Sequence, residues 1–472
     1  MKRVVQRLRR SAGGFCSDRR GNVAIIFSLA ALPLVGFIGA SIDYSRASSV
    51  RTAFQNALDS TALMLAKEAS SDSSTQLQAN AAKYFNALFG DTGVSGLSVT
   101  ASYSNEGGSK VVVSGSGNVP TTFMKVLGYR SIGIGGSSTA AWGSTRLRVA
   151  LVLDNTGSMT ESGKLTALKT ATQNMLTQLQ SAASMNGDVY VSIVPFVKDV
   201  NVGAGNYNSD WIYWGTAQQD PTGADNTSWE ANNGNCSTFA LPFLFPSPRA
   251  ACLANSGTWT PKSHSTWNGC VMDRGFPTSP SNLSGNSGPD MTNNYDATVG
   301  SPDVTKPASL YAAEQYGSCP SAAVMGLNYD WPAMSTVVNN MRANGNTNQA
   351  VGLQLGWMSL VGGGPFTAPT VDPNYNYTQI IILLTDGLNT QNRWYTNQTS
   401  IDTRQQLTCN NIKASGITLY TIQVNTGGDP TSSLLQNCAS SPGKFFLLTS
   451  ASQIVTTFQA IGTNLTQLRV AR

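Results

Sequence analysis

The 472-residue chain contains a single histidine, His264, and this residue lies in a segment without regular periodicity. Any Ser-His-Asp or Cys-His mechanism would have to use that one side chain. The sequence also has no G-x-S-x-G elbow, no H-E-x-x-H pair and no P-loop. A lone histidine in a loop is usually a solvent-facing side chain. These absences predict a protein that is not an enzyme.

No two cysteines have C-x-x-C spacing, which argues against a zinc knuckle or a redox motif. Cys16 lies near the N-terminus, and the other six are Cys236, Cys252, Cys270, Cys319, Cys409 and Cys438. An even number in the body of the chain suits an oxidising compartment. We expect three disulfides, with Cys409–Cys438 and pairs within residues 236–319 preferred. The alternative is that some are buried thiols.

Charge is unevenly distributed along the chain. There are 30 basic and 25 acidic residues, a formal net charge of +5. Residues 1–20 hold seven basic residues and one acidic residue, which leaves 23 basic and 24 acidic residues, a net charge of −1, in the remainder. No phosphate-neutralising surface is expected there, so we expect no nucleic-acid binding.

A run of 20 uncharged residues, Val23 to Ile42, follows the basic tail. It is close to the ~20 residues that a helix needs to cross a bilayer, and its Pro33 is tolerated better in membranes than in water. The positive-inside rule keeps residues 1–20 in the cytoplasm and exports the rest. A cleaved signal peptide is the alternative, but its apolar core is usually only ~7–15 residues. We therefore expect a retained single-pass anchor over 21–43 in the inner (cytoplasmic) membrane, with the bulk of the chain periplasmic or extracellular.

Oxygen-bearing side chains follow two apolar, strand-like runs. Asp154-Asn155-Thr156-Gly157-Ser158 comes after residues 148–153, and Asp386-Gly387 comes after residues 379–385. Between them, Gly345-Asn346-Thr347-Asn348-Gln349 precedes a helix-like stretch. Ligands bind at the carboxyl ends of strands in open α/β sheets, and Mg²⁺ prefers oxygen ligands. A short D-x-T-x-S alone is more often a helix cap, but three such loops in this order favour a metal-dependent binding module.

The order D-x-T-x-S, a lone Thr and L-T-D-G resembles the metal-ion-dependent adhesion site of von Willebrand factor A domains. The usual first motif is D-x-S-x-S, and Thr156 keeps the hydroxyl that a metal needs. The resemblance implies that Asp154, Thr156, Ser158 and Thr347 are inner or outer ligands of Mg²⁺ (or Mn²⁺ or Ca²⁺). It implies that Asp386 contacts the metal ion through a bound water molecule. It also implies an open coordination position for an acidic side chain of a protein partner.

The segment after the anchor alternates helices with short strands. Small residues recur at helical spacing over 43–70, a second helix is expected at about 76–89, and residues 97–142 have strand character. This is the outline of a pilin-like stalk and small sheet over 44–143. Arg19-Arg20-Gly21-Asn22-Val23 onwards, with Ile42-Asp43-Tyr44-Ser45-Arg46, resembles the N-terminus of TadG-like proteins of the tight-adherence (Flp) pilus assembly system. Related pseudopilins are cut after a Gly with Glu five residues on, where this chain has Ile26, so we expect no cleavage.

Residues 144–472 alternate apolar strands with helices, which predicts an α/β domain with a doubly wound, mainly parallel sheet. Strands are expected at 148–153, 188–197, 378–384, 417–424 and 444–449. Helices are expected at 164–181, 334–343, 348–360, 402–414, 431–438 and 452–468. An insertion over about 199–332 lacks this rhythm but is rich in Trp. It could hold a recognition surface or cover the domain edge.

Two functions remain open on these grounds. The first is a membrane-anchored pilus-assembly protein that binds partners of the pilus machinery or envelope through the metal site. The alternative is a cell-envelope adhesin that binds an external ligand through the same site. A metal-assisted hydrolase is a distant third, because no general base accompanies Asp154.

Overall fold

The computed structural model describes residues 21–69, 72–90, 93–105, 108–142, 145–221, 223, 225–238, 241–245, 248–276 and 293–470. The chain divides into two compact units, residues 1–142 and 143–472. The basic tail over 1–20, including Cys16, lies outside the described residues.

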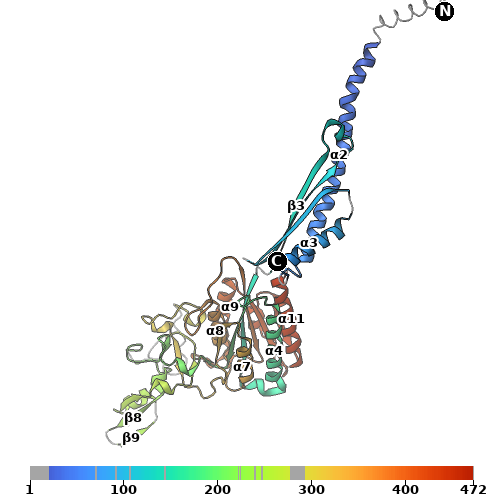
Figure 1. The fold of residues 1–472 in the computed structure, drawn as a ribbon. Coiled ribbons are helices and arrows are strands. Elements are labelled where there is room, and N and C mark those ends of the chain that lie inside the picture. Colours follow the sequence, from blue (N-terminus) through green and yellow to red (C-terminus); the bar gives the residue numbers. More distant parts are fainter. Residues whose placement is uncertain are drawn as a thin grey trace, which may run out of the picture. The chain divides into compact units, whose positions relative to one another are not determined.

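The first unit packs two helices on a small sheet (Figure 1). Helix α2 (Gly21–Leu65) runs for 45 residues through Pro33, and α3 (Ser74–Phe89) begins at a capping box formed by Ser73 and Gln76. The antiparallel sheet has the order β1 (Ser95–Ser104), β2 (Ser109–Pro120) and β3 (Ser131–Trp142). The expected helices and strand character of this region are confirmed.

Aromatic side chains from both helices form the centre of this core. Phe54 of α2 has its ring centroid 5.1 Å from Phe85 and 5.3 Å from Phe89, both of α3. Edge-to-face rings at this separation add stability beyond their buried area. Among the described residues, no helix combines the length and the apolar character needed to cross a membrane.

The second unit is built on a ten-stranded sheet whose first five strands are parallel. Their order is β16 (Phe445–Leu448), β15 (Thr418–Val424), β14 (Asn376–Thr385), β4 (Thr145–Asp154) and β5 (Val189–Phe196). Strand order reverses at β4, because β5 follows it on one side and β14 flanks it on the other. The crevice at such a reversal is where open α/β sheets bind ligands. The predicted mainly parallel sheet is confirmed.

Helices cover both faces of this sheet, as Figure 1 shows. One face carries α4 (Lys164–Ala182), α7 (Trp331–Asn340) and α11 (Ser452–Val470), whose apolar residues share a core with Leu151 and Ile382. The other face carries α8 (Gln349–Val361), α9 (Gln398–Ala414) and α10 (Ser433–Cys438), which pack with Val152 and Leu383. Helix α8 approaches β4 closely because Gly356 has no side chain: a Cβ there would lie 2.5 Å from Val152. Alternate residues of each strand face opposite cores, as expected for a doubly wound sheet.

The insertion is more regular than the sequence predicted. Its strands β6 (Val200–Asn201), β11 (Cys270–Val271), β12 (Tyr311–Glu314) and β7 (Ile212–Tyr213) extend the main sheet, and β13 (Met325–Asn328) pairs with β5. A separate sheet has the order β10 (Thr258–Pro261), β8 (Gly234–Thr238) and β9 (Leu241–Phe245). These strands have two to five residues. Periodicity is not readable in segments that short.

Three disulfides join the six expected cysteines. Cys236 bonds Cys252, Cys270 bonds Cys319, and Cys409 bonds Cys438. The preferred pairing of Cys409 with Cys438 and the pairing within residues 236–319 are confirmed. Such bonds persist in compartments outside the cytoplasm.

Replacing Cys409 and Cys438 together with Ala should lower the free energy of unfolding by about 3–4 kcal/mol, because their bond spans 29 residues and restricts the unfolded chain. Chemical denaturation of the full chain measures the change. The Cys236–Cys252 pair, which spans 16 residues, provides the matched control, and its removal should cost slightly less. An unchanged unfolding free energy for the first variant would contradict the prediction.

Candidate metal centre

Asp154 and Asp386 meet at the carboxyl edge of two neighbouring parallel strands. Asp154 is the last residue of β4, and Asp386 directly follows β14, with Leu384 in register with Leu153. Both carboxylates are buried. Thr385 donates a hydrogen bond from Oγ1 to Asp154 Oδ2 at 2.6 Å. The parallel register therefore brings together two residues that are 232 positions apart in the printed sequence.

Two hydroxyl groups link these carboxylates into one cluster. Asp154 Oδ1 accepts the backbone N–H of Thr156 at 2.7 Å, which bends the loop back on itself. Thr156 Oγ1 lies 3.2 Å from Ser158 Oγ, and Ser158 donates to Asp386 Oδ1 at 2.6 Å. Thr156 makes no side-chain capping bond, and the N-cap of α4 is Gly163. Thr156 holds the N-cap position of the short helix η2 (Gly157–Gly163), but its hydroxyl lies against Ser158 and makes no capping bond.

The loop that carries Thr347 lies against the Asp154 loop. Gly157 donates its N–H to Gly345 O at 3.0 Å, and Asn344 donates to Asn155 O at 2.8 Å. Thr347 is buried, and its backbone N–H donates to Thr390 Oγ1 at 2.9 Å. Its loop thus joins both strand-end loops. The role of its hydroxyl as a ligand stays a prediction.

The electrostatics of this cluster favour a cation. Burial, followed by repulsion from Asp386, raises the pKa of Asp154 to about 7. Two buried carboxylates and two hydroxyls form an all-oxygen donor set, which suits a hard cation that keeps part of its water shell. Within the described part of the chain, no group of three or more His, Cys, Asp or Glu side chains is arranged as a metal site. The donor set fits Mg²⁺ only with hydroxyl and water ligands beside the two carboxylates.

Residues 21–66 match the family model described as "Putative Flp pilus-assembly TadE/G-like". This chain has a TadE/G-like N-terminal region. The matched residues coincide with helix α2, which ends at Leu65. No sequence among the curated proteins matches the chain.

The solved structures that match the chain at low identity include several pilus proteins and a matrix protein of the mussel byssus. The pilus adhesin SpaC of Lactobacillus rhamnosus GG in its open conformation has a TM-score of 0.36 and 13% identity, over 80% of this chain and 35% of that one. The vWF domain of the type V pili tip protein Mfa5 of Porphyromonas gingivalis has a TM-score of 0.34 and 10% identity, over 69% of this chain and 96% of that one. The tip pilin GBS104 of Group B Streptococcus agalactiae has a TM-score of 0.33 and 10% identity, over 78% of this chain and 68% of that one. The chain thus spans about a third of the SpaC structure.

Lys164 is a residue of the candidate site that the sequence did not reveal. Its Nζ lies 2.5 Å from Asp386 Oδ2, and its side chain is 5% exposed. Lys164 is also the first residue of α4, where the helix dipole disfavours a cation. The ion pair with Asp386 offsets that cost. No local motif signals a contact between residues 222 positions apart.

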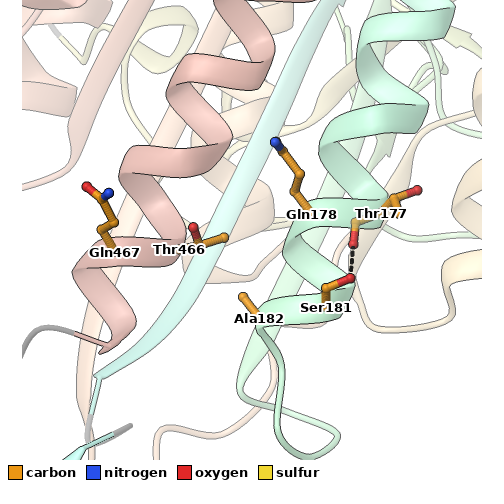
Figure 2. Close-up of a pocket in the computed structure, with 6 residues that line it drawn as sticks. All are labelled: Thr177, Gln178, Ser181, Ala182, Thr466 and Gln467. Atoms are coloured by element: carbon orange, nitrogen blue, oxygen red, sulfur yellow. Dashed lines mark hydrogen bonds between the residues drawn. The ribbon is translucent and has the colours of Figure 1, made fainter.

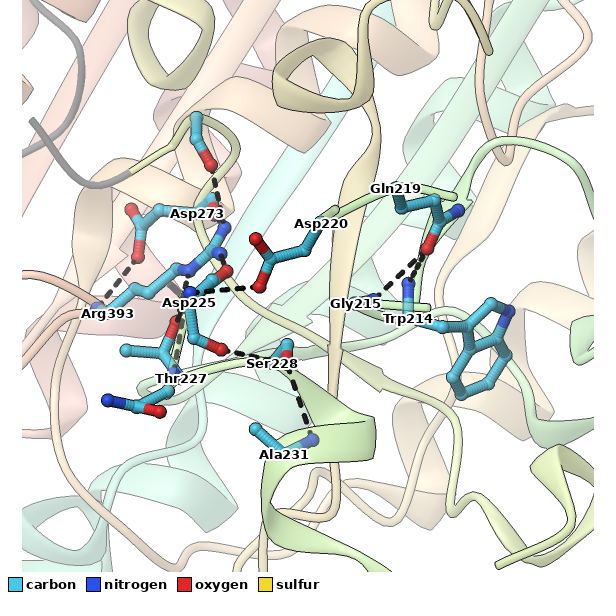
Figure 3. Close-up of polar contacts among 12 residues, drawn as sticks. Trp214, Gly215, Gln219, Asp220, Asp225, Thr227, Ser228, Ala231, Asp273 and Arg393 are labelled. Atoms are coloured by element: carbon cyan, nitrogen blue, oxygen red, sulfur yellow. Dashed lines mark hydrogen bonds and ion pairs between the residues drawn. The ribbon is translucent and has the colours of Figure 1, made fainter. Parts of the chain in front are cut away.

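The disulfide-bonded insertion contacts two of the site loops, and Figure 3 shows its contacts with Arg393. Asp273 Oδ2 accepts from Asn348 Nδ2 at 2.9 Å and from the backbone N–H of Arg393 at 3.1 Å. Asn348 follows Thr347, and Arg393 lies on the segment that leaves Asp386. Burial raises the pKa of Asp273 to about 6. The insertion therefore forms part of the support of the candidate site.

Arg393 is the centre of this network. Its guanidinium donates to Asp225 Oδ2 at 2.5 Å, to Thr227 Oγ1 at 3.0 Å and to two backbone carbonyls, those of Asp273 and Gly275. The side chains of Arg393 and Asp225 are 0% and 1% exposed. A charge pair this deeply buried depends on both partners, because either one alone would be uncompensated.

Arg393→Met should therefore lower the free energy of unfolding by about 3–5 kcal/mol, because Asp225 would stay buried without a countercharge. Thermal or chemical unfolding measures this, and limited proteolysis should show earlier cleavage within residues 199–332. Arg249→Met is the matched control, since Arg249 is 15% exposed and lies 3.4 Å from Asp220. Equal losses in both variants would show that the Arg393 network has no special role.

A separate groove of about 500 Å³ lies between α4 and α11 (Figure 2). It is lined by Thr177, Gln178, Ser181, Ala182, Thr466 and Gln467. All six side chains are neutral, and Ser181 donates to the backbone carbonyl of Thr177. The groove offers neither a nucleophile with a base nor a set of metal ligands.

Proposed function

We propose that this chain is a membrane-anchored protein of the tight-adherence (Flp) pilus assembly system that binds protein partners through a divalent-metal adhesion site. The observation that carries the proposal is the convergence of Asp154, Asp386 and two hydroxyls at the strand-order reversal of a parallel sheet. The TadE/G-like match over residues 21–66 supports the pilus system. Asp154, Thr156, Ser158, Thr347 and Asp386 are the proposed ligands of Mg²⁺ (or Mn²⁺ or Ca²⁺).

The charge balance of the site supports an acidic partner. Two carboxylates, from Asp154 and Asp386, and the ammonium of Lys164 give a net charge of about −1 when all three are ionised. A bound divalent ion would change that to about +1 in a buried setting. An Asp or Glu side chain of the partner would neutralise the remaining charge while completing the coordination shell. The role of this chain's residues is to hold that ion and orient its open position.

The membrane anchor is proposed for residues 21–43. Large apolar side chains of α2 are 51–75% exposed: Ile26, Phe27, Leu29, Leu34, Val35, Phe37, Ile38 and Ile42. An apolar surface of this extent needs a cover. A bilayer supplies one, and the basic tail over 1–20 would then stay in the cytoplasm with the rest exported.

A cross-linked membrane pull-down on the tagged full chain, run with Mg²⁺ and with a chelator, tests this function. Recovery of pilus-machinery proteins only with metal is the expected result. Recovery under both conditions would leave the pilus role and overturn the metal-dependent capture. Loss of pili on deletion of residues 21–143 would support assembly, whereas retained pili with lost surface attachment would favour the adhesin.

A further inference from the structure

The connection between β2 and β3 exposes an unusual number of apolar side chains. Val126 is 88% exposed, Tyr129 64%, Leu127 61% and Phe123 45%. The short helix η1 (Met124–Leu127) at its centre buries none of its residues. Turns of soluble hairpins are normally polar, so exposed apolar side chains here indicate an interaction surface. We call residues 121–130 the hairpin tip.

The hairpin tip is held in a defined conformation by α2. Both carboxylate oxygens of Asp43 accept backbone N–H groups: Oδ1 accepts from Thr122 at 3.0 Å, and Oδ2 accepts from Phe123 at 2.8 Å and Met124 at 2.7 Å. Asp43 is 4% exposed, so this cap is shielded from water. The exposed apolar side chains of the tip are therefore presented by an ordered backbone.

Glycines in α2 allow the tip to lie directly on the helix. A Cβ at Gly39 would lie 2.5 Å from Phe123 Cβ, and one at Gly36 would lie 3.8 Å from Leu127 Cδ1. Residues 36–39 fall within the uncharged run of 23–42. The tip thus lies beside the part of α2 that carries Val35, Phe37 and Ile38, each more than half exposed. Exposed apolar side chains of the tip and of the helix therefore occur at the same level of α2.

We propose that the hairpin tip inserts into the interfacial region of the bilayer on the exported side, as a second membrane contact beside α2. This rests on the proposed membrane anchor. Interfacial segments combine apolar side chains with Tyr, Lys and Arg at headgroup level. The tip has Lys125, Tyr129 and Arg130, and Tyr44 of α2 is 70% exposed one residue after Asp43.

Lipid suits this surface better than a second copy of α2. Lys125 and Arg130 are both exposed, and residues 23–42 contain no acidic residue that could pair with them in another copy. Anionic headgroups such as phosphatidylglycerol would pair with both cations. The long aliphatic stems of Lys and Arg can lie along apolar surface while their charges reach the headgroups.

The test uses the full chain in vesicles of phosphatidylcholine, with and without phosphatidylglycerol. Cys16→Ser removes the one cysteine outside the three disulfides described above, and single cysteines are placed as Val126→Cys in the tip, Phe37→Cys in α2 or Ser104→Cys at the far end of β1. Each is labelled with an environment-sensitive fluorophore. Ser104 is exposed and ends β1, beside the turn that joins β1 to β2. The 12 residues of β2 separate that turn from the tip. At ~3.4 Å per residue, these span roughly 40 Å.

Lipids that carry a quencher in the upper acyl chain should lower the emission of the label at 126 roughly twofold, since interfacial segments lie about 5–10 Å into the bilayer boundary. The label at 37 should be quenched and the label at 104 unaffected. Quenching at 37 without quenching at 126 would overturn the inference and leave the anchor intact. A blue shift at 126 without lipid quenching would assign the tip to a protein contact instead. Quenching at neither 37 nor 126 would overturn the anchor itself.

Discussion

Asp154→Asn should lower the affinity of the chain for Mg²⁺ by about 100-fold or more, because this removes one of only two carboxylates that face the proposed ion. The fold should be unaffected. Asn keeps an acceptor for the N–H of Thr156 and a polar partner for Thr385, the two contacts that Asp154 makes at 2.7 and 2.6 Å. Burial and repulsion from Asp386 disfavour the ionised Asp154, so a neutral isostere should leave the metal-free domain as stable as before or more stable.

Isothermal titration with Mg²⁺ and Mn²⁺ measures the affinity, and thermal unfolding with a chelator measures the stability. Asp429→Asn is the matched control, since Asp429 is an exposed aspartate that does not contact Asp154 or Asp386 in the described structure. In the pull-down, the Asp154 variant should behave in Mg²⁺ as the unaltered chain behaves with chelator. An unchanged Mg²⁺ affinity in a folded variant would refute the metal site.

Lys164→Met should destabilise the metal-free domain by about 3–5 kcal/mol, since Asp386 would remain buried with no countercharge. The Asp386 side chain is 0% exposed, and its bond from Lys164 is 2.5 Å long. A divalent ion at the site would supply the missing positive charge. Mg²⁺ should therefore raise the melting temperature of this variant more than that of the unaltered chain.

Glu161→Gln provides the matched control for Lys164. Glu161 lies 3.8 Å from the same Nζ but is 73% exposed, so its loss should change the unfolding free energy by less than about 1 kcal/mol. Melting curves of the three proteins across a Mg²⁺ titration make the comparison. If Mg²⁺ shifts the variant and the unaltered chain equally, Lys164 does not share the site with the ion.

Much of the architecture was predictable because its signals are local. Apolar runs such as 379–385 are long enough to identify as buried strands, and the small-residue stripe after Asp43 is long enough to identify as a helix. The insertion was read as irregular because its strands have only two to five residues and owe their conformation to pairing with distant partners such as Glu314 and Cys270. Short segments of this kind form strands only when a neighbouring strand satisfies their backbone groups.

Some residues of the candidate site could likewise be found from the sequence, and others could not. Asp154, Thr156, Ser158 and Asp386 were found because each follows a readable strand, and the parallel register of β4 and β14 brings them together. Lys164 and Arg393 were missed. Their partners lie 222 and 168 residues away, and a buried cation has no periodic pattern that reveals which carboxylate it neutralises.

The sequence by itself determined the order of helices and strands outside the insertion, the candidate oxygen ligands at two strand ends and the expectation of three disulfides. These follow from apolar periodicity, from turn chemistry and from cysteine count, which are properties of short stretches of chain. Only the tertiary structure decided that Lys164 neutralises Asp386, that Arg393 ties the insertion to the site loops, and that Asp43 holds the hairpin tip against α2. Burial makes each of these contacts strong, and burial depends on how distant segments pack.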